Sequence, residues 1–98
     1  MNANDLSFGI EIETIAPDSA VQNDGLRIGP YKRGIQVPYL PAGWKAEADG
    51  SIDNSNGGHR CEIVSPILRG PEGLAQVAEV VRTLEAKGHR VNASTGVH

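Results

Sequence analysis

The chain has 98 residues, which suits a single domain, and 39% of them are apolar. That fraction is low for a globular protein but too high for a disordered one. With one Trp, one Phe and two Tyr residues, the core must come mainly from Ile, Leu and Val. A net charge of −3 argues against nucleic acid as the main partner, because phosphate backbones are bound by basic surfaces.

The cysteine content and the hydropathy of the sequence indicate the cellular compartment of the protein. Cys61 is the only cysteine, so an internal disulfide is impossible and a reducing cytoplasm is the simplest setting. No apolar run is long enough to cross a membrane, and residues 1–5 lack the charge and apolar stretch of a signal peptide. We therefore predict a cytoplasmic protein with no membrane partner.

The first predicted strand covers residues 8–14, with the sequence FGIEIET. Its period of two puts Phe8, Ile10 and Ile12 on one face and Glu11 and Glu13 on the other. Two carboxylates at i and i+2 lie roughly 6.5–7 Å apart along a strand, so they can reach one metal ion or two neighbouring ions. A solvated outer face is the alternative, and the spacing alone favours it.

The middle of the chain is harder to interpret. Residues 16–43 are rich in Pro and Gly and show no clear helix, so we predict a long connection with one short strand near 35–39. Residues 44–48 are predicted to form a further strand. The turn that follows contains Asp49 and Ser51, which could orient a substrate or a metal-bound water, although these residues by themselves favour a plain turn.

Residues 60–65 form the next predicted strand, which Pro66 ends. Alternation puts Glu62 on an otherwise largely apolar face, where a charge needs a partner. Glu62 is therefore either a rim residue paired with Arg60 or Lys45, or a ligand, and the sequence leaves both interpretations open.

A helix is predicted over residues 71–87, with Pro71 in its first turn and Gly88 as its stop. A strand at residues 89–93 follows. The predicted buried stripe of the helix has i, i+3, i+4 spacing and consists of Leu74, Val77, Ala78, Val81 and Leu84. His59 and His89 are expected to be solvated, and His98 has little meaning by itself at the last position.

The segments FGIEIE, GWKAEADGSI, CEIVSPILRG and VNASTGVH occur in that order. This series resembles the putative amidoligase family from about residue 8 to residue 98. In that family the last segment continues as His-x-His, whereas this chain stops at the first of those histidines. We therefore expect residues 1–98 to be one partial domain, the N-terminal part of a longer catalytic domain, and expect this part to be inactive by itself.

The resemblance implies an α+β fold: a curved, mainly antiparallel sheet with one long helix packed on it, as part of a glutamine synthetase-like fold. It also implies a ligase that uses ATP and Mg²⁺ or Mn²⁺ to join a small-molecule or peptide carboxylate to an amine through an acyl phosphate. The implied metal ligands and catalytic residues are Glu11, Glu13 and Glu62, on one sheet face. His98 would contact metal or phosphate, and Asp49 and Ser51 would lie near the substrate.

Other functions fit the same residues. A glutamate–cysteine ligase-like enzyme of the same superfamily is one alternative. A non-catalytic binding or structural protein, associated with a phage, is another and belongs to a different class. A plain α+β domain with a solvated acidic strand is the third, and it would be favoured if the acidic side chains pointed apart.

Overall fold

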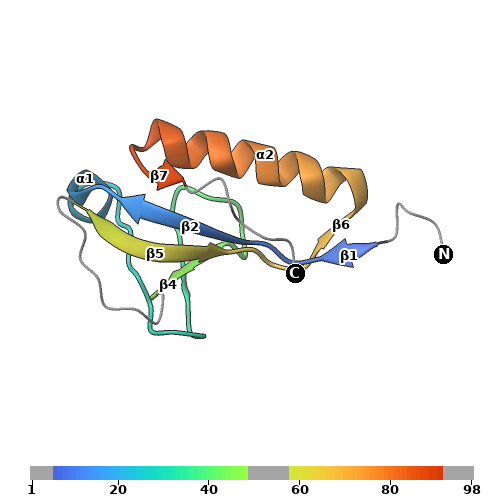
Figure 1. The fold of residues 1–98 in the computed structure, drawn as a ribbon, viewed down its shortest axis with the longest axis horizontal. Helices are drawn as coiled ribbons and strands as arrows, with labels where there is room; N and C mark the ends of the chain where they lie inside the picture. The colour runs from blue at the N-terminus through green and yellow to red at the C-terminus, as the bar shows by residue number, and fades with distance from the viewer. Residues whose placement is uncertain (1–5, 49–57, 92–98) are drawn as a thin grey trace.

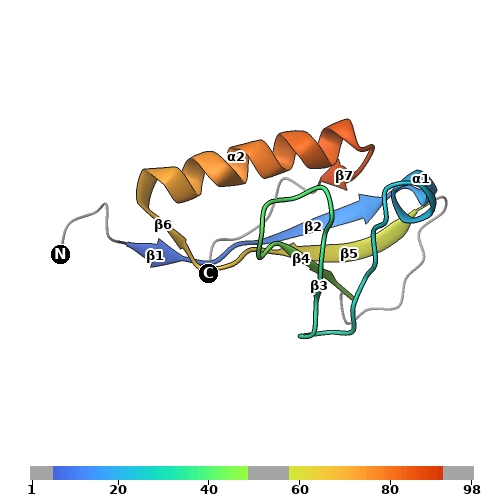
Figure 2. The ribbon, with the colours of Figure 1, turned by 180° about the vertical axis from the view of Figure 1, so that it is seen from behind.

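A computed structural model describes residues 6–48 and 58–91. Its centre is a five-stranded sheet in the order β3-β4-β5-β2-β7, in which every neighbouring pair of strands is antiparallel. The long helix α2 lies across one face of the sheet (Figures 1 and 2). The elements are β1 (Ser7–Phe8), β2 (Glu11–Ala16), α1 (Asp18–Gln22), β3 (Ile35–Gln36), β4 (Lys45–Glu47), β5 (His59–Val64), β6 (Leu68–Arg69), α2 (Gly70–Ala86) and β7 (Arg90–Val91). The predicted α+β class, with antiparallel strands and one long helix, is confirmed.

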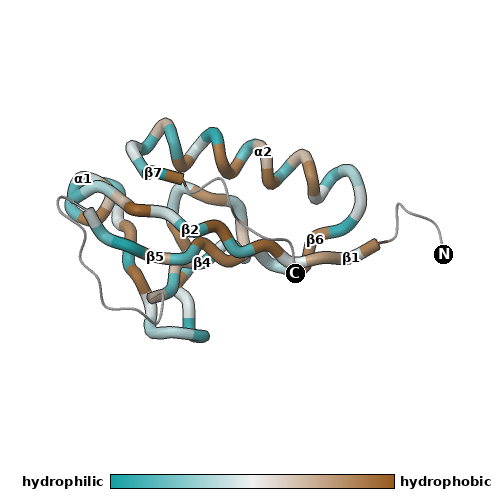
Figure 3. The backbone as a smooth tube through the Cα atoms, in the orientation of Figure 1, coloured by the Kyte–Doolittle hydropathy of each residue, from teal (hydrophilic) through white to brown (hydrophobic). Residues whose placement is uncertain are grey.

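Strands β2 and β5 form the longest ladder, which runs from the Glu11–Val64 pair to the Ala16–His59 pair. Hydrophobic and hydrophilic residues alternate along both strands (Figure 3). Ile12 and Ile63 are opposite one another and face the helix, where they are 2% and 0% exposed. The period-two pattern therefore produces one buried face and one outward face, as expected for a sheet covered on one side.

The core fills the space between the sheet and α2. Val80 and Leu84 of the helix are fully buried and belong to the same apolar cluster as Ile12 and Ile63. Trp44, also fully buried, donates a hydrogen bond of 2.6 Å from its indole nitrogen to the Gln76 side-chain oxygen. That bond satisfies the buried N–H and connects the start of β4 to the helix.

The predicted buried stripe of the helix is correct in part: Leu84 is fully buried, and Val77 and Val81 are half-buried and pack against the core. Leu74 is 62% exposed and Ala78 is exposed, whereas Gly73 and Val80 are buried. A Cβ atom on Gly73 would lie 2.9 Å from the Leu68 Cβ, so the first turn of α2 approaches the β1–β6 ladder closely. Because that close approach needs a glycine, the helix is turned so that Gly73 faces inward and its neighbour faces outward.

A short helix was also absent from the sequence interpretation. The structure places α1 directly after Pro17, inside the segment predicted as an irregular connection. This helix has five residues, which is little more than one turn. A period of 3.6 cannot be recognised in so short a segment.

The orientation of α2 can be tested with two matched substitutions, one on its buried face and one on its exposed face. Leu84→Ala should cost about 2–5 kcal/mol of unfolding free energy, because it leaves a cavity in the core. Leu74→Ala should cost less than about 0.5 kcal/mol, since that side chain is exposed. Urea unfolding of both variants measures the difference, and equal costs would contradict the observed orientation of α2.

Candidate functional site

Three glutamates lie in one row across the outward face of the sheet, opposite the helix. Glu13 of β2 is directly opposite Glu62 of β5, and Glu62 is directly opposite Glu47 of β4. Residues opposite one another in an antiparallel sheet have Cα atoms about 4.5–5.5 Å apart and share a face. We call Glu13, Glu62 and Glu47 the acidic row.

The core fixes the register that forms this row. Ile12 and Ile63, which precede and follow the two paired glutamates, are buried on the helix side. A slip of one residue would move those apolar side chains outward and bring the carboxylates into the core, so the register is strongly specified. The acidic row is therefore a direct consequence of the apolar pattern on the other face.

Burial increases along the row from β2 to β4. Glu13 is exposed, Glu62 is half-buried and Glu47 is 8% exposed. Within residues 6–48 and 58–91, no group forms a hydrogen bond or ion pair with the Glu47 carboxylate. A buried carboxylate without a partner is costly and is uncommon in native proteins, so this position calls for a cation or a donor from a ligand.

Glu11 occupies the neighbouring row. It is opposite Val64, and Val64 is opposite Lys45. Glu11 therefore shares the outward face with Glu13 and Glu62, roughly 6.5–7 Å along the strand from Glu13, but it is not a cross-strand neighbour of another glutamate. The expected common face of the three predicted acidic residues is present.

The donor chemistry of the acidic row suits a hard cation, although it forms no complete cage. Among the described residues, no group of three or more His, Cys, Asp or Glu side chains is arranged to hold a metal ion. Mg²⁺ usually takes one or two protein carboxylates and completes its shell with waters and substrate phosphates. Adjacent pairs in the row fit that requirement. Asp49, Ser51 and His98, predicted near substrate or metal, lie outside the described residues.

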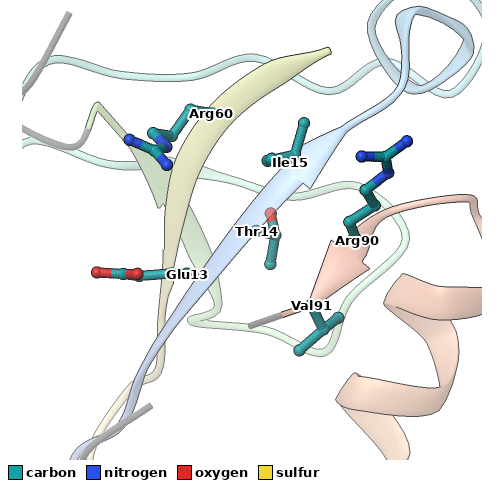
Figure 4. A pocket seen from close by; sticks show the side chains of 6 residues that line it. All are labelled: Glu13, Thr14, Ile15, Arg60, Arg90 and Val91. Carbon is teal, nitrogen blue, oxygen red and sulfur yellow. The ribbon is translucent and has the colours of Figure 1, made fainter. Parts of the chain in front are cut away.

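A second, basic row lies beside the acidic one. Ile15 of β2 is opposite Arg60 of β5 on one side and Arg90 of β7 on the other. Figure 4 shows these two arginines on either side of Ile15, with Glu13 below. Together with Thr14 and Val91, they line a cavity of about 140 Å³. The outward face therefore has carboxylates and guanidinium groups side by side.

A polar network on the helix side of the sheet holds β7 against β2. His89 was expected to be solvated, and that was wrong: it is 4% exposed. Its Nε2 lies 2.6 Å from the Tyr39 hydroxyl and its Nδ1 lies 3.2 Å from the Thr14 hydroxyl. Burial is the main cause that lowers the pKa of His89 to about 4, against a smaller opposite effect of Asp24.

The same buried environment keeps its other members neutral. Burial, with smaller contributions from Cys61 and Asp24, raises the pKa of Tyr39 to about 12. Burial also raises the pKa of the Cys61 thiol, whose sulfur lies 3.5 Å from the Thr14 hydroxyl. Because all three groups are uncharged at pH 7, this network has a structural role, and the charged chemistry lies on the other face.

Sequence reasoning did not identify Glu47, Arg60 and Arg90 as site residues. Alternation in residues 44–48 already places Lys45 and Glu47 on one face, which was an available signal. That Glu47 lies opposite Glu62, however, depends on a pairing of strands that local sequence does not reveal.

The fold and this face define an α+β protein with an acidic, partly buried row of side chains on the outward face of an antiparallel sheet. The model of a protein family described as "Putative amidoligase enzyme" matches residues 4–98, and the chain belongs to that family. No curated protein matches the chain, and no solved structure matches it. In the part of the chain that the structure describes, no helix has the length and apolar character to span a membrane.

The buried imidazole predicts a pH dependence of stability. The unfolded chain binds a proton at His89 below its ordinary pKa of about 6.5, whereas the folded chain does so only near pH 4. Stability should therefore fall as the pH falls through this window, by about 2 kcal/mol between pH 7 and pH 5. Urea midpoints measured at both pH values test this. His89→Gln should flatten the dependence. The control His59→Gln, at a half-exposed histidine whose Nε2 lies 2.8 Å from the Asp18 carboxylate, should retain the part of the dependence that comes from His89.

Proposed function

We propose that the chain supplies the metal- and nucleotide-binding face of an ATP- and Mg²⁺-dependent carboxylate–amine ligase. The acidic row carries this proposal, above all the buried Glu47 carboxylate that no described residue pairs with. Membership of the amidoligase family supports a ligase in general. The acidic row also explains why the reaction would need a divalent cation. ATP phosphates and these carboxylates repel one another unless such an ion lies between them.

The proposed reaction has two steps. The substrate carboxylate attacks the γ-phosphorus of ATP, which releases ADP and gives an acyl phosphate. The amine then attacks the acyl carbon, phosphate leaves and an amide forms. Mg²⁺ or Mn²⁺ would supply charge neutralisation for the transferred phosphoryl group.

In this reaction the residues of the chain have distinct tasks. Glu13 and Glu62, as cross-strand neighbours, would hold one ion, and Glu62 with Glu47 could hold a second one. Glu11, two residues from Glu13 on the same face of β2, would be a further ligand of the first ion. His98 as a ligand or phosphate contact, and Asp49 and Ser51 near the substrate, remain predictions from the family resemblance.

Metal binding can be tested on the isolated chain. Like charges directly opposite one another in a sheet are destabilising by a few tenths of a kcal/mol, so Glu62→Gln should stabilise the metal-free fold slightly. With Mn²⁺ at ten times its Kd, the unsubstituted chain should gain about 1.4 kcal/mol, and Glu62→Gln should lose this gain.

Thermal unfolding with and without Mn²⁺, together with the electron paramagnetic resonance signal of free Mn²⁺, gives both readouts. Glu79→Gln, at an exposed position of α2, is the matched control and should behave like the unsubstituted chain. If Mn²⁺ stabilised Glu62→Gln and the unsubstituted chain equally, the acidic row would not be the metal site.

Catalysis is tested in an active ligase that contains this chain. Hydroxylamine serves as a general amine that converts acyl phosphates to hydroxamates, and a panel of amino acids and dicarboxylates serves as the acids. Glu11→Gln or Glu13→Gln should reduce ATP-dependent hydroxamate formation by at least about 100-fold, because each removes a charge from the metal site. Unchanged rates in both variants, with the fold intact, would contradict the proposed mechanism.

A further inference from the structure

The cavity between Arg60 and Arg90 has features of a separate binding site. Both arginines are exposed, and each is a cross-strand neighbour of Ile15, so the apolar Ile15 side chain forms a floor with a guanidinium group on each side (Figure 4). The cavity of about 140 Å³ exceeds the roughly 30 Å³ that one water occupies in the liquid, so a phosphate or carboxylate group has room there.

Neither guanidinium group has a polar side-chain partner in the part of the chain that the structure describes. Among residues 6–48 and 58–91, Arg60 and Arg90 form no side-chain hydrogen bond and no ion pair. Arginine's planar fork of donors matches the paired oxygens of carboxylates and phosphates. Two guanidinium groups that line one cavity can therefore donate hydrogen bonds to a bound oxyanion.

The strands hold both arginines in place. Arg60 lies on β5, the longest partner of β2, and Arg90 follows His89, whose hydrogen bonds to Tyr39 and Thr14 fix the start of β7. Sheet pairing therefore fixes the backbone position of each arginine, which lowers the entropy cost of binding.

We propose that Arg60 and Arg90 form an oxyanion subsite that binds a phosphate or carboxylate group of the ligand whose metal-bound part contacts the acidic row. Glu13, which belongs to the acidic row, also lines this cavity, so the subsite borders the row directly. Glu13 and Ile15 are two residues apart on β2, which places them roughly 6.5–7 Å apart along the strand. Assigning the anion to a ligase substrate rests on the proposed function, whereas the binding of an anion by the two arginines does not.

The test is a titration of the chain with inorganic pyrophosphate, and separately with succinate, in buffer that has been freed of divalent metal ions on a chelating resin. The side-chain Nε–H resonances of Arg60 and Arg90 in ¹⁵N-labelled protein should shift as each anion binds. Arg60→Gln and Arg90→Gln should each weaken binding about tenfold, the expected loss of a charge-assisted hydrogen bond. Arg90→Lys, which keeps the charge but loses the fork, should fall between Gln and Arg.

Arg82→Gln, at an exposed position of α2 on the opposite side of the sheet, is the matched control and should bind like the unsubstituted chain. Tighter pyrophosphate binding would assign the subsite to a nucleotide phosphate, and tighter succinate binding to a substrate carboxylate. Binding by the double variant Arg60→Gln/Arg90→Gln within twofold of the unsubstituted chain, with an unchanged urea midpoint, would overturn the proposal.

Failure of the proposed function gives a different result. If the acidic row binds no metal, Mn²⁺ will not stabilise the chain, but the effect of the arginine substitutions on metal-free pyrophosphate or succinate binding will persist. If the subsite is absent, Glu62→Gln will still abolish the Mn²⁺ gain while Arg60→Gln and Arg90→Gln change nothing.

Discussion

Strand β2 pairs with β5 along its whole length, and this ladder determines which side chains face the helix and which face away from it. Ile12 and Ile63 meet on the buried side. Because neighbouring residues on a strand point to opposite faces, the same pairing puts Glu13 beside Glu62 on the outer side. The same register therefore determines both the packing of the core and the pairing of the glutamates on the outer side. A shift of the register would change both.

The outward face combines opposite charges in adjacent rows. A carboxylate row across β4, β5 and β2 would repel anions, and an arginine pair across β5 and β7 would attract them. A ligand that carries both a divalent cation and an oxyanion complements this pattern at two points. Two-point recognition restricts the orientation of a ligand more than either row could.

Local sequence was sufficient where short-range patterns decide the structure. The strand containing Glu11 and Glu13, the strand containing Glu62, and the long helix were all expected within one to three residues of their observed bounds. Local sequence was insufficient where distant residues decide. His89 is buried because Tyr39, which is 50 residues away, covers it, and Glu47 joins the site because β4 pairs with β5. Likewise, Leu74 is exposed because Gly73 must face Leu68.

The charges on β2 also matter before the fold exists. Strand β2 is synthesised well before β5, so during translation its alternating Ile and Glu residues are at first unpaired with their native partner strand. If two nascent copies paired through β2 in register, like charges would be placed beside like charges, a configuration that disfavours edge-to-edge association. The carboxylates that we assign to a ligand in the folded protein would therefore act as gatekeepers against aggregation while the chain is still being made.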